Sequence, residues 1–330
     1  MATLKDIAKL AHVNVSTVSR ALNNSPYVNA ETKKVILSVA EKLSYNPNVI
    51  EKALNKGKFH SLGIIVPNVQ MTVFMDFIQK AEVQAAVMNY DIIVAMSDDD
   101  SEKERHLLNR MRYGLVDGIL IASTGENNKL LEDINVSGIP ITQIFRNVDS
   151  KLDSVSVNYK QSVKIAIQAL TESGINEIGF INGPIKDISY NDKYVEFAKQ
   201  TIKQKLISHI KNPTIYPKSF IELGHDYAQQ ILTEFPNTKG FLVANDPEVI
   251  GVLQYLEEQN LTIPDDIKII SLAGCSISNL LQKVSATTLP INQLSVQALS
   301  LTIAKAEKIE ESINPKKIIL NTKFVDRKTC

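Results

Sequence analysis

The segment Asn14–Asn24 reads NVSTVSRALNN and combines small hydroxyl side chains, amides and one arginine with a helical pattern of apolar residues. At about 100° per residue, one face of such a helix carries Val15, Ser16, Ser19 and Asn23. Serine and threonine hydroxyls are short, so they let the backbone come close to a phosphate or a base edge. Arg20 can pair with a guanine edge or hold a phosphate. This face therefore has the chemistry of nucleic-acid binding, whereas a face that serves solubility alone favours Glu and Lys.

Three helices are predicted around this segment, and a capping residue precedes each of them. Their ranges are about Leu4–Ala11, Val15–Leu22 and Ala30–Leu43. Thr3 followed by Asp6 fits a capping box, and Asn14 and Asn29 can cap the other two helices. Their apolar positions predict a small shared core of Ile7, Ala8, Ala11, Val18, Leu22, Val35 and Val39. Two short helices joined by a tight turn and followed by a third predict a helix-turn-helix unit.

The charges of the chain are divided unevenly, although the formal net charge of the 330 residues is zero. The first 60 residues hold nine Lys or Arg and four Asp or Glu, whereas the remainder holds 27 basic and 32 acidic residues. A basic head on an acidic body suggests that the head meets a polyanion. A solvated helical surface would give the same counts, so charge alone leaves both interpretations open.

A linker follows the third predicted helix and reads YNPNVIEKALNKGKFHS. Pro47 disfavours the helical conformation in the residue before it and therefore ends that helix. Asn48 can cap a short segment that runs through Leu54, and Gly57 can end it. The linker is thus able to form about two helical turns.

From Leu62 onward, apolar strand patterns alternate with helical ones. The predicted strands are LGIIVP, DIIVAM, VDGILIA, IPITQI, EIGFIN, a short one near Thr214–Tyr216, GFLVAN and IKIISL. The predicted helices span about 74–89, 101–113, 128–136, 160–173, 190–208, 225–235 and 247–259. Continuous apolar strands between helices indicate parallel sheets that are covered on both faces.

The alternation restarts near residue 160 and therefore predicts two doubly wound α/β units. We expect a helix-turn-helix head over 1–46, a hinge helix and linker over 47–60, and a body over 61–330. The N-terminal unit of the body is expected at about 61–159 plus 291–320, and the C-terminal unit at about 160–290 plus 321–330. A ligand of such sheets binds outside the carboxyl ends of the strands, which places it in the cleft between the units.

The motifs of common enzyme chemistry are missing from the sequence. It has no P-loop, no G-x-G-x-x-G, no H-E-x-x-H, no C-x-x-C and no G-x-S-x-G. Its five histidines have no evident nucleophile partner, and Cys275 and Cys330 lack metal-ligand spacing. We therefore expect no catalysis, no cofactor and no metal. Without a signal peptide or a membrane-spanning stretch, a cytoplasmic protein is expected.

One acidic run, SDDDSEKE at 97–104, has two interpretations. It could be a metal-binding loop. It could also begin a helix, with Ser101 as the cap and Glu102 and Glu104 placed favourably near the helix N-terminus. The helix start is the favoured interpretation.

The first sixty residues resemble the DNA-binding head and hinge of the lactose-repressor (LacI/GalR) family of bacterial transcription regulators. The resemblance is densest in DIAKLAHVNVSTVSRALN. It extends through the body, where LGIIVP, VDGILIA, GFINGP, VAND and IPDDIKIISLAG occur in the order of that family. The resemblance implies a helix-turn-helix head on a body of the periplasmic-binding-protein type, composed of two doubly wound parallel-sheet subdomains.

The resemblance implies that the second helix lies in the major groove of DNA and that two hinge segments pair at the operator centre. The residues expected to contact DNA are Thr3, Asn14, Val15, Ser16, Thr17, Ser19, Arg20, Asn23, Tyr27 and Leu54. Leu54 matches the leucine that the family inserts into the minor groove, where an apolar wedge kinks the duplex. Glu51 departs from the family, which usually has alanine there, and its carboxylate would weaken docking of the hinge near phosphates.

The resemblance also places an effector site in the body, and here the sequence departs from the family. The residues expected around the effector are Phe74, Asn191, Lys193, Asn245, Asp246 and Ala273. Asn191 stands where the family has an arginine, and Ala273 stands where it has an aspartate. A pocket without these charged anchors does not hold a sugar in the usual way, because buried ligand hydroxyls need partners. Either the small-molecule ligand is different or less polar, or a protein exerts the control.

The second alternative follows from similarity to the catabolite control branch of the family, which uses a seryl-phosphorylated phosphocarrier protein as corepressor. MSDDDSEKERHLLNRM and VSVNYKQS are similar to that branch. The late helix that meets the phosphocarrier there offers an aromatic-acidic pair and an arginine, whereas this chain has Leu294, Ser295 and Thr302. A phosphoserine without its arginine loses much of its attraction, so both alternatives stay open.

The sequence is thus interpreted as a homodimeric, sequence-specific DNA-binding regulator, with repression as the expected effect. Its partners would be a pseudo-palindromic operator in double-stranded DNA, a second copy of the chain, and either a small-molecule effector or a phosphorylated carrier protein. Membranes are not expected among the partners. A ligand-binding protein with a vestigial head and an enzyme that uses the cleft are the rival interpretations.

Overall fold

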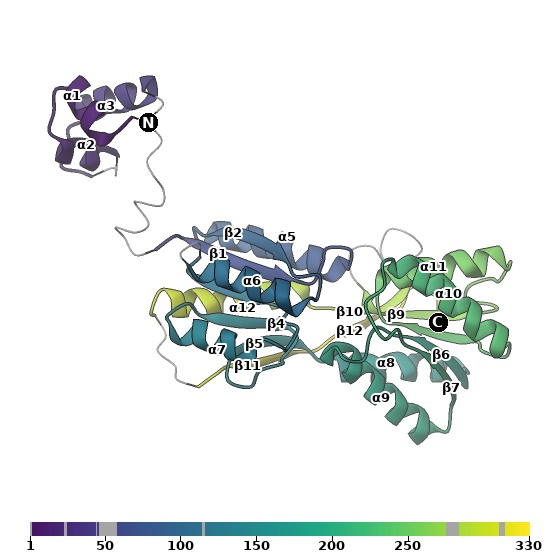
Figure 1. Ribbon diagram of the computed structural model, residues 1–330. Coiled ribbons are helices and arrows are strands. Elements are labelled where there is room, and N and C mark those ends of the chain that lie inside the picture. The colour runs from purple at the N-terminus through teal and green to yellow at the C-terminus, as the bar shows by residue number, and fades with distance from the viewer. Residues whose placement is uncertain are drawn as a thin grey trace. The chain divides into compact units, whose positions relative to one another are not determined.

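The computed structural model describes residues 2–22, 25–43, 45, 58–113, 116–274, 284–309 and 314–330. The chain divides into two compact units, Met1–Phe59 and His60–Cys330. The first unit, called the head, is helical (Figure 1). The second, called the body, contains two six-stranded sheets with helices on both faces of each. The head and body match the predicted fold class.

The head contains three short helices, and side-chain caps fix the starts of the first and the third. They are α1 (Leu4–Leu10), α2 (Val15–Leu22) and α3 (Ala30–Lys42). The Thr3 hydroxyl accepts from the Asp6 amide, and the Asp6 carboxylate accepts from the Thr3 amide at 2.8 Å, which completes the predicted capping box. The Asn29 side chain accepts from the Thr32 amide at 2.7 Å and caps α3 as predicted.

The core of the head holds these three helices together. Its buried members are Ile7, Ala8, Ala11, Val18, Ala21, Ile36 and Ala40, with Leu22 and Val39 partly buried against them. One predicted member was wrong, because Val35 is 47% exposed and its neighbour Ile36 is fully buried. Adjacent residues on a helix lie about 100° apart, so one can face the core while the other faces solvent, and their order in the sequence does not say which.

The first sheet of the body is entirely parallel and forms what we call the N-subdomain. Its order is β11-β5-β4-β3-β1-β2, from strands β1 (Ser61–Val66), β2 (Asp91–Met96), β3 (Gly118–Ile121), β4 (Ile141–Phe145), β5 (Asp153–Val157) and β11 (Lys317–Leu320). Helices α5 (Thr72–Val87) and α12 (Ile291–Ala306) cover one face, and α6 (Ser101–Arg112) and α7 (Asn128–Val136) cover the other. The strands consist mostly of buried residues because helices cover both faces.

The second sheet forms the C-subdomain and is parallel except at one edge, where β12 pairs antiparallel with β10. Its order is β12-β10-β9-β8-β6-β7, from strands β6 (Glu177–Ile181), β7 (Ile207–Lys211), β8 (Gly240–Val243), β9 (Lys268–Gly274), β10 (Ser285–Thr288) and β12 (Lys323–Val325). Its helices are α8 (Tyr159–Glu172) and α9 (Ile188–Gln204) on one face, with α10 (Phe220–Glu234) and α11 (Asp246–Glu258) on the other.

Three short segments connect the two subdomains. They run from β5 to α8, from β10 to α12 and from β11 to β12. Two of these segments are joined by a hydrogen bond from the Asn158 amide group to the Asn321 side-chain oxygen at 3.0 Å. Connections this short allow the subdomains to rotate about the crossing point, which is how a two-subdomain body opens and closes around a ligand.

One predicted strand was wrong, and the error shifts the end of a helix. The strand expected near Thr214–Tyr216 is a loop, and β7 lies earlier in the chain, at Ile207–Lys211. Helix α9 ends at Gln204 because Lys205 adopts the left-handed conformation, with φ of 55°. The alternating residues that follow then pair with β6.

The acidic run at 97–104 begins helix α6, as favoured, although its cap is Asp100 and not Ser101. The Asp100 carboxylate accepts from the Lys103 amide at 2.7 Å. Glu104 is fully buried and accepts from Ser123, Thr124 and Asn127. Among the described residues no cluster of His, Cys, Asp or Glu could hold a metal ion. Across the same residues, no helix has both the length and the apolar character that crossing a membrane requires.

The two adjacent residues of α3 give a matched test of the head. Ile36→Ala should lower the free energy of unfolding of the head by about 2–4 kcal/mol, because it removes a buried side chain and leaves a cavity. Val35→Ala should change it by less than about 1 kcal/mol, since Val35 is exposed. Native-state hydrogen exchange of α3 amides in the full-length protein measures both values. Equal effects of the two substitutions would contradict this assignment of the core.

Candidate functional site

Helix α2 exposes part of the face that the sequence predicted. Asn14, Val15, Ser16 and Arg20 are exposed, while Thr17 and Ser19 are half-buried beside the fully buried Val18. Valine on an exposed position supplies apolar surface between polar groups, which suits contact with a thymine methyl group. Helix α2 and the residue before it therefore expose hydroxyl, amide, guanidinium and apolar groups together.

The remaining predicted DNA contacts lie elsewhere in the head or outside the described part of the chain. Thr3 caps α1, and Tyr27 is 88% exposed in the turn before α3. Asn23 and Leu54 lie outside the described residues, as does Glu51, so the hinge contacts stay predictions. His12 in the turn between α1 and α2 has φ of 53°, the left-handed conformation that lets the chain reverse between the two helices.

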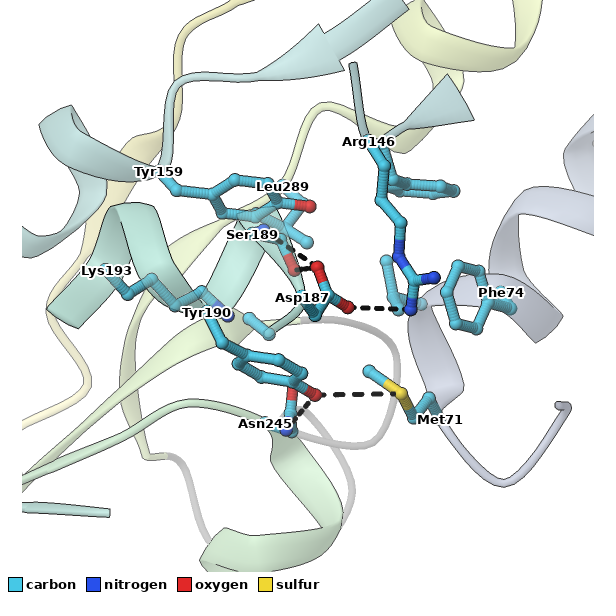
Figure 2. A pocket seen from close by; sticks show the side chains of 13 residues that line it. Met71, Phe74, Arg146, Tyr159, Asp187, Ser189, Tyr190, Lys193, Asn245 and Leu289 are labelled. Atoms are coloured by element: carbon cyan, nitrogen blue, oxygen red, sulfur yellow. Dashed lines mark hydrogen bonds and ion pairs between the residues drawn. The ribbon is translucent and has the colours of Figure 1, made fainter. Parts of the chain in front are cut away.

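Four of the six predicted effector residues line a small cavity between the subdomains, and two do not. Phe74, Lys193, Asn245 and Ala273 line this cavity, which has a volume of about 20 Å³ (Figure 2). Asn191 is exposed, and Asp246 is buried with its carboxylate accepting from the Ser271 hydroxyl at 2.7 Å; neither is among the residues that line it. A volume near 20 Å³ holds about one water molecule, so side chains fill the place where a ligand was expected.

One of the side chains that line this cavity is Arg146, which follows β4 and makes contacts on both sides of the cleft. Its guanidinium donates to Asp99 of the N-subdomain at 2.5 Å and to the Ser123 carbonyl at 3.2 Å. It also lies 2.6 Å from the Asp187 carboxylate and donates to the Tyr216 hydroxyl at 2.7 Å, both in the C-subdomain (Figure 2 shows the Asp187 contact). Arg146 thus joins the two subdomains directly.

The charges of this cluster depend on one another. Burial opposes the charge of Arg146, but Asp187, Tyr216 and Asp99 outweigh it and raise the pKa of Arg146 above its ordinary value. Burial would likewise raise the pKa of Asp187, yet Arg146 and hydrogen bonds from Tyr216 and Ser189 hold that pKa below its ordinary value. Both groups therefore stay charged near neutral pH.

A second buried group of polar side chains lies on the C-subdomain side of the cavity. The Lys193 ammonium donates to the Ala244 carbonyl at 3.2 Å and lies about 5 Å from the ring centres of Tyr159 and Tyr190. Burial raises the pKa of Glu248 to about 8, although the Asn245 amide group donates to its carboxyl group at 3.1 Å. This group places a cation and several donors beside the cavity.

Two further features complete the cleft. The Tyr190 hydroxyl accepts from the Asn245 amide group at 2.9 Å and contacts the Met71 sulfur at 3.8 Å, which links the subdomains a second time (Figure 2). A larger cavity of about 410 Å³ is also lined by Arg146 and Asp187. Loops of both subdomains line it, including Ser101, Thr124, Glu126, Lys186 and Ile188. It has room for a ligand the size of a sugar.

Sequence reasoning missed Arg146, Asp187 and Tyr216. Arg146 follows a predicted strand, and Asp187 precedes a predicted helix, so their places at element ends were visible. Tyr216 fell in a segment wrongly predicted as a strand. The pairing itself had no local signal, because Arg146 is 41 positions from Asp187 and 70 from Tyr216.

The late-helix positions that were compared with a phosphocarrier-docking face are not on the surface. Leu294, Ser295 and Thr302 of α12 are fully buried, and the Thr302 hydroxyl lies 2.8 Å from that of Thr142. The exposed residues of this helix are neutral and polar, namely Asn292, Gln293, Gln297 and Ser300. These three positions therefore offer no side chain to a docking partner.

Comparisons with known proteins agree with this architecture. The model of bacterial regulatory proteins of the lacI family matches residues 3–48, and that of the periplasmic binding protein-like domain matches residues 167–330. The lac repressor dimer bound to operator and the anti-inducer ONPF superposes with a TM-score of 0.85 at 17% identity, covering 99% of this chain and 98% of that one. The fold is therefore shared over nearly the whole length.

Relatives of known sequence also cover nearly the whole chain. Catabolite control protein A of Priestia megaterium is 26% identical over 302 residues, which cover 91% of each chain. The Probable HTH-type transcriptional repressor ExuR of Bacillus subtilis (strain 168) is 30% identical over 335 residues, covering 99% of this chain and 98% of its own. A helix-turn-helix head precedes a two-subdomain body in this chain, and the relatives are transcription regulators and not enzymes. The chain therefore belongs to the lacI family of bacterial regulatory proteins.

Proposed function

We propose that this regulator binds a pseudo-palindromic operator as a homodimer and represses transcription, with its affinity set by an effector in the body. A head of residues 1–46 reads the DNA, a hinge of residues 47–60 transmits the state of the body, and residues 61–330 sense and dimerise. The observation that carries the proposal is the exposed face of α2, held on a capped three-helix core. Its work on operators would take place in the cytoplasm, where bacterial DNA lies.

Dimer formation is supported by apolar surface at one edge of the N-subdomain. Strand β2 is the edge strand of its sheet, and Ile93, Val94 and Met96 on it are more than a third exposed. The neighbouring helix α5 exposes Val83 at 53% and Val87 at 76%. Apolar side chains gathered at a sheet edge favour association. A second copy is the proposed partner, since the lac repressor binds its operator as a dimer.

A small molecule in the cleft is favoured over a phosphorylated carrier protein. The exposed residues of α12 carry no charge, so that face offers no arginine to a phosphoserine. The cleft, in contrast, brings buried charged groups and a cavity of about 410 Å³ together between the subdomains. A ligand there could change the angle between the subdomains and so the spacing of the two heads.

Selection of random duplex DNA with the purified full-length protein tests the proposal. At moderate salt and without added ligand, we expect an enriched pseudo-palindrome whose two halves are related by a two-fold axis. The affinity for the enriched sequence should fall steeply as salt is raised. If no sequence is enriched with or without extracts of small metabolites, the protein does not read DNA as proposed.

Arg20 is expected to read a base. Arg20→Ala should weaken binding to the selected operator by about 1–3 kcal/mol while leaving binding to random DNA much less affected. Arg20→Lys is the matched control, because it keeps the charge and loses the planar fork that pairs with guanine. Titrations by fluorescence anisotropy on both DNAs measure these losses. An equal loss on the two DNAs would make Arg20 a phosphate contact.

The apolar edge is expected to be the dimer interface. Val83→Asp combined with Val87→Asp should convert the dimer to a monomer and weaken operator binding, because charges are costly to bury at an interface. Val136→Asp is the control, since Val136 is 85% exposed on α7, which lies on the opposite face of the sheet from α5. Light scattering after size-exclusion chromatography gives the mass. A dimer that survives the double substitution would show that the interface lies elsewhere.

A further inference from the structure

The cleft of this protein is closed around its own side chains. The central cavity of about 20 Å³ has room for one water molecule. The side chains of Arg146, Asp99 and Asp187 are only 4%, 8% and 3% exposed, respectively. A charged cluster is thus buried in the cleft between the subdomains. In two-subdomain proteins of this kind, a ligand occupies that place when the cleft closes.

The arrangement of this cluster depends on closure. Asp99 belongs to the N-subdomain, like Arg146, and would stay with it when the cleft opens. Asp187 and the Tyr216 hydroxyl belong to the C-subdomain and would be carried away from Arg146. The Tyr216 hydroxyl also donates to the Asp187 carboxylate at 2.6 Å, so the two acceptors move as one unit. Opening therefore breaks two charge-assisted contacts of Arg146 at once.

We propose that Arg146, Asp99, Asp187 and Tyr216 form a latch that holds the cleft closed when no effector is bound. Arg146 contacts both subdomains, as a ligand bound in the cleft would otherwise do. An effector then regulates the protein by competing with the latch. The role of the latch in regulation rests on the function proposed above, whereas its role in holding the cleft closed does not.

The surroundings of the latch are consistent with movement about a hinge. Three short connections join the subdomains, and the contact between Tyr190 and Met71 is the weak sulfur contact at 3.8 Å. The Tyr190 ring packs directly against Gly183, where an added Cβ would lie 2.4 Å from the ring. Tyr190 is therefore fixed within the C-subdomain, and the latch supplies the ionic part of the contact between the two halves.

The test measures the distance between the subdomains in the full-length protein without ligand. Spin labels are placed on cysteines at Val136 of α7 and Ile202 of α9, which are 85% and 78% exposed, after Cys275→Ser and Cys330→Ser. Labelled protein is diluted with unlabelled protein so that pairs within one chain dominate. Pulsed electron double resonance then gives the distribution of closed and open forms.

The ligand-free wild type should give one narrow distribution, from the closed form. Arg146→Gln should shift the closed-to-open equilibrium towards open by on the order of 100-fold or more, because it leaves two buried carboxylates without their cation. Asp187→Asn should shift it in the same direction while keeping a side-chain acceptor at the start of α9. Arg105→Gln, which removes an exposed ion pair with Glu102 on α6, should leave the distribution unchanged.

Two results would overturn the latch. The first is a ligand-free wild type that is mainly open. The second is Asp187→Asn or Arg146→Gln protein that is folded by circular dichroism and keeps the distribution of the wild type. The DNA selection is independent of these distances. Closed protein that enriches no DNA would refute the proposed function alone, and DNA-binding protein with an open cleft would refute the latch alone.

Discussion

The buried charge of Arg146 is the constraint around which the body is arranged. A guanidinium does not give up its proton in a protein, so burial cannot be relieved by neutralisation as it is for a carboxyl group. The chain must therefore supply acceptors, and it supplies them from a loop after β2, from the start of α9 and from the loop after β7. Only the closed arrangement of the two subdomains brings all three together.

The head could be predicted well from sequence because its determinants are local. The capping box of Thr3 and Asp6 and the cap at Asn29 involve residues three positions apart, and both were confirmed. The error at Val35 shows the limit of such reasoning. Adjacent apolar residues on an amphipathic helix give the same periodic signal, and packing against α1 and α2 decides that Ile36 is the one buried.

The body shows the same limit at a larger scale. The alternation of strands and helices predicted two parallel sheets, and the family pattern led to Phe74, Lys193, Asn245 and Ala273 at the cavity. The side chains that fill the cleft were missed because they come from loops. The direction of a loop side chain is fixed by distant partners, and a single error in the ending of α9 concealed that Tyr216 faces the cleft.

The two positions that depart from the charged anchors of the family, Asn191 and Ala273, now have a physical interpretation. Asn191 lies on the surface and Ala273 adds no charge to the cavity, while Arg146 and Lys193 add two buried cations beside Asp187. An effector changes the equilibrium of the body only by the difference between its affinities for the closed and open forms. An uncharged ligand that leaves Arg146 with its carboxylates would have to use the larger cavity of about 410 Å³. A ligand that separates Asp187 from Arg146 removes one of the two carboxylates that balance the buried guanidinium, and an anionic group on the ligand would restore that charge.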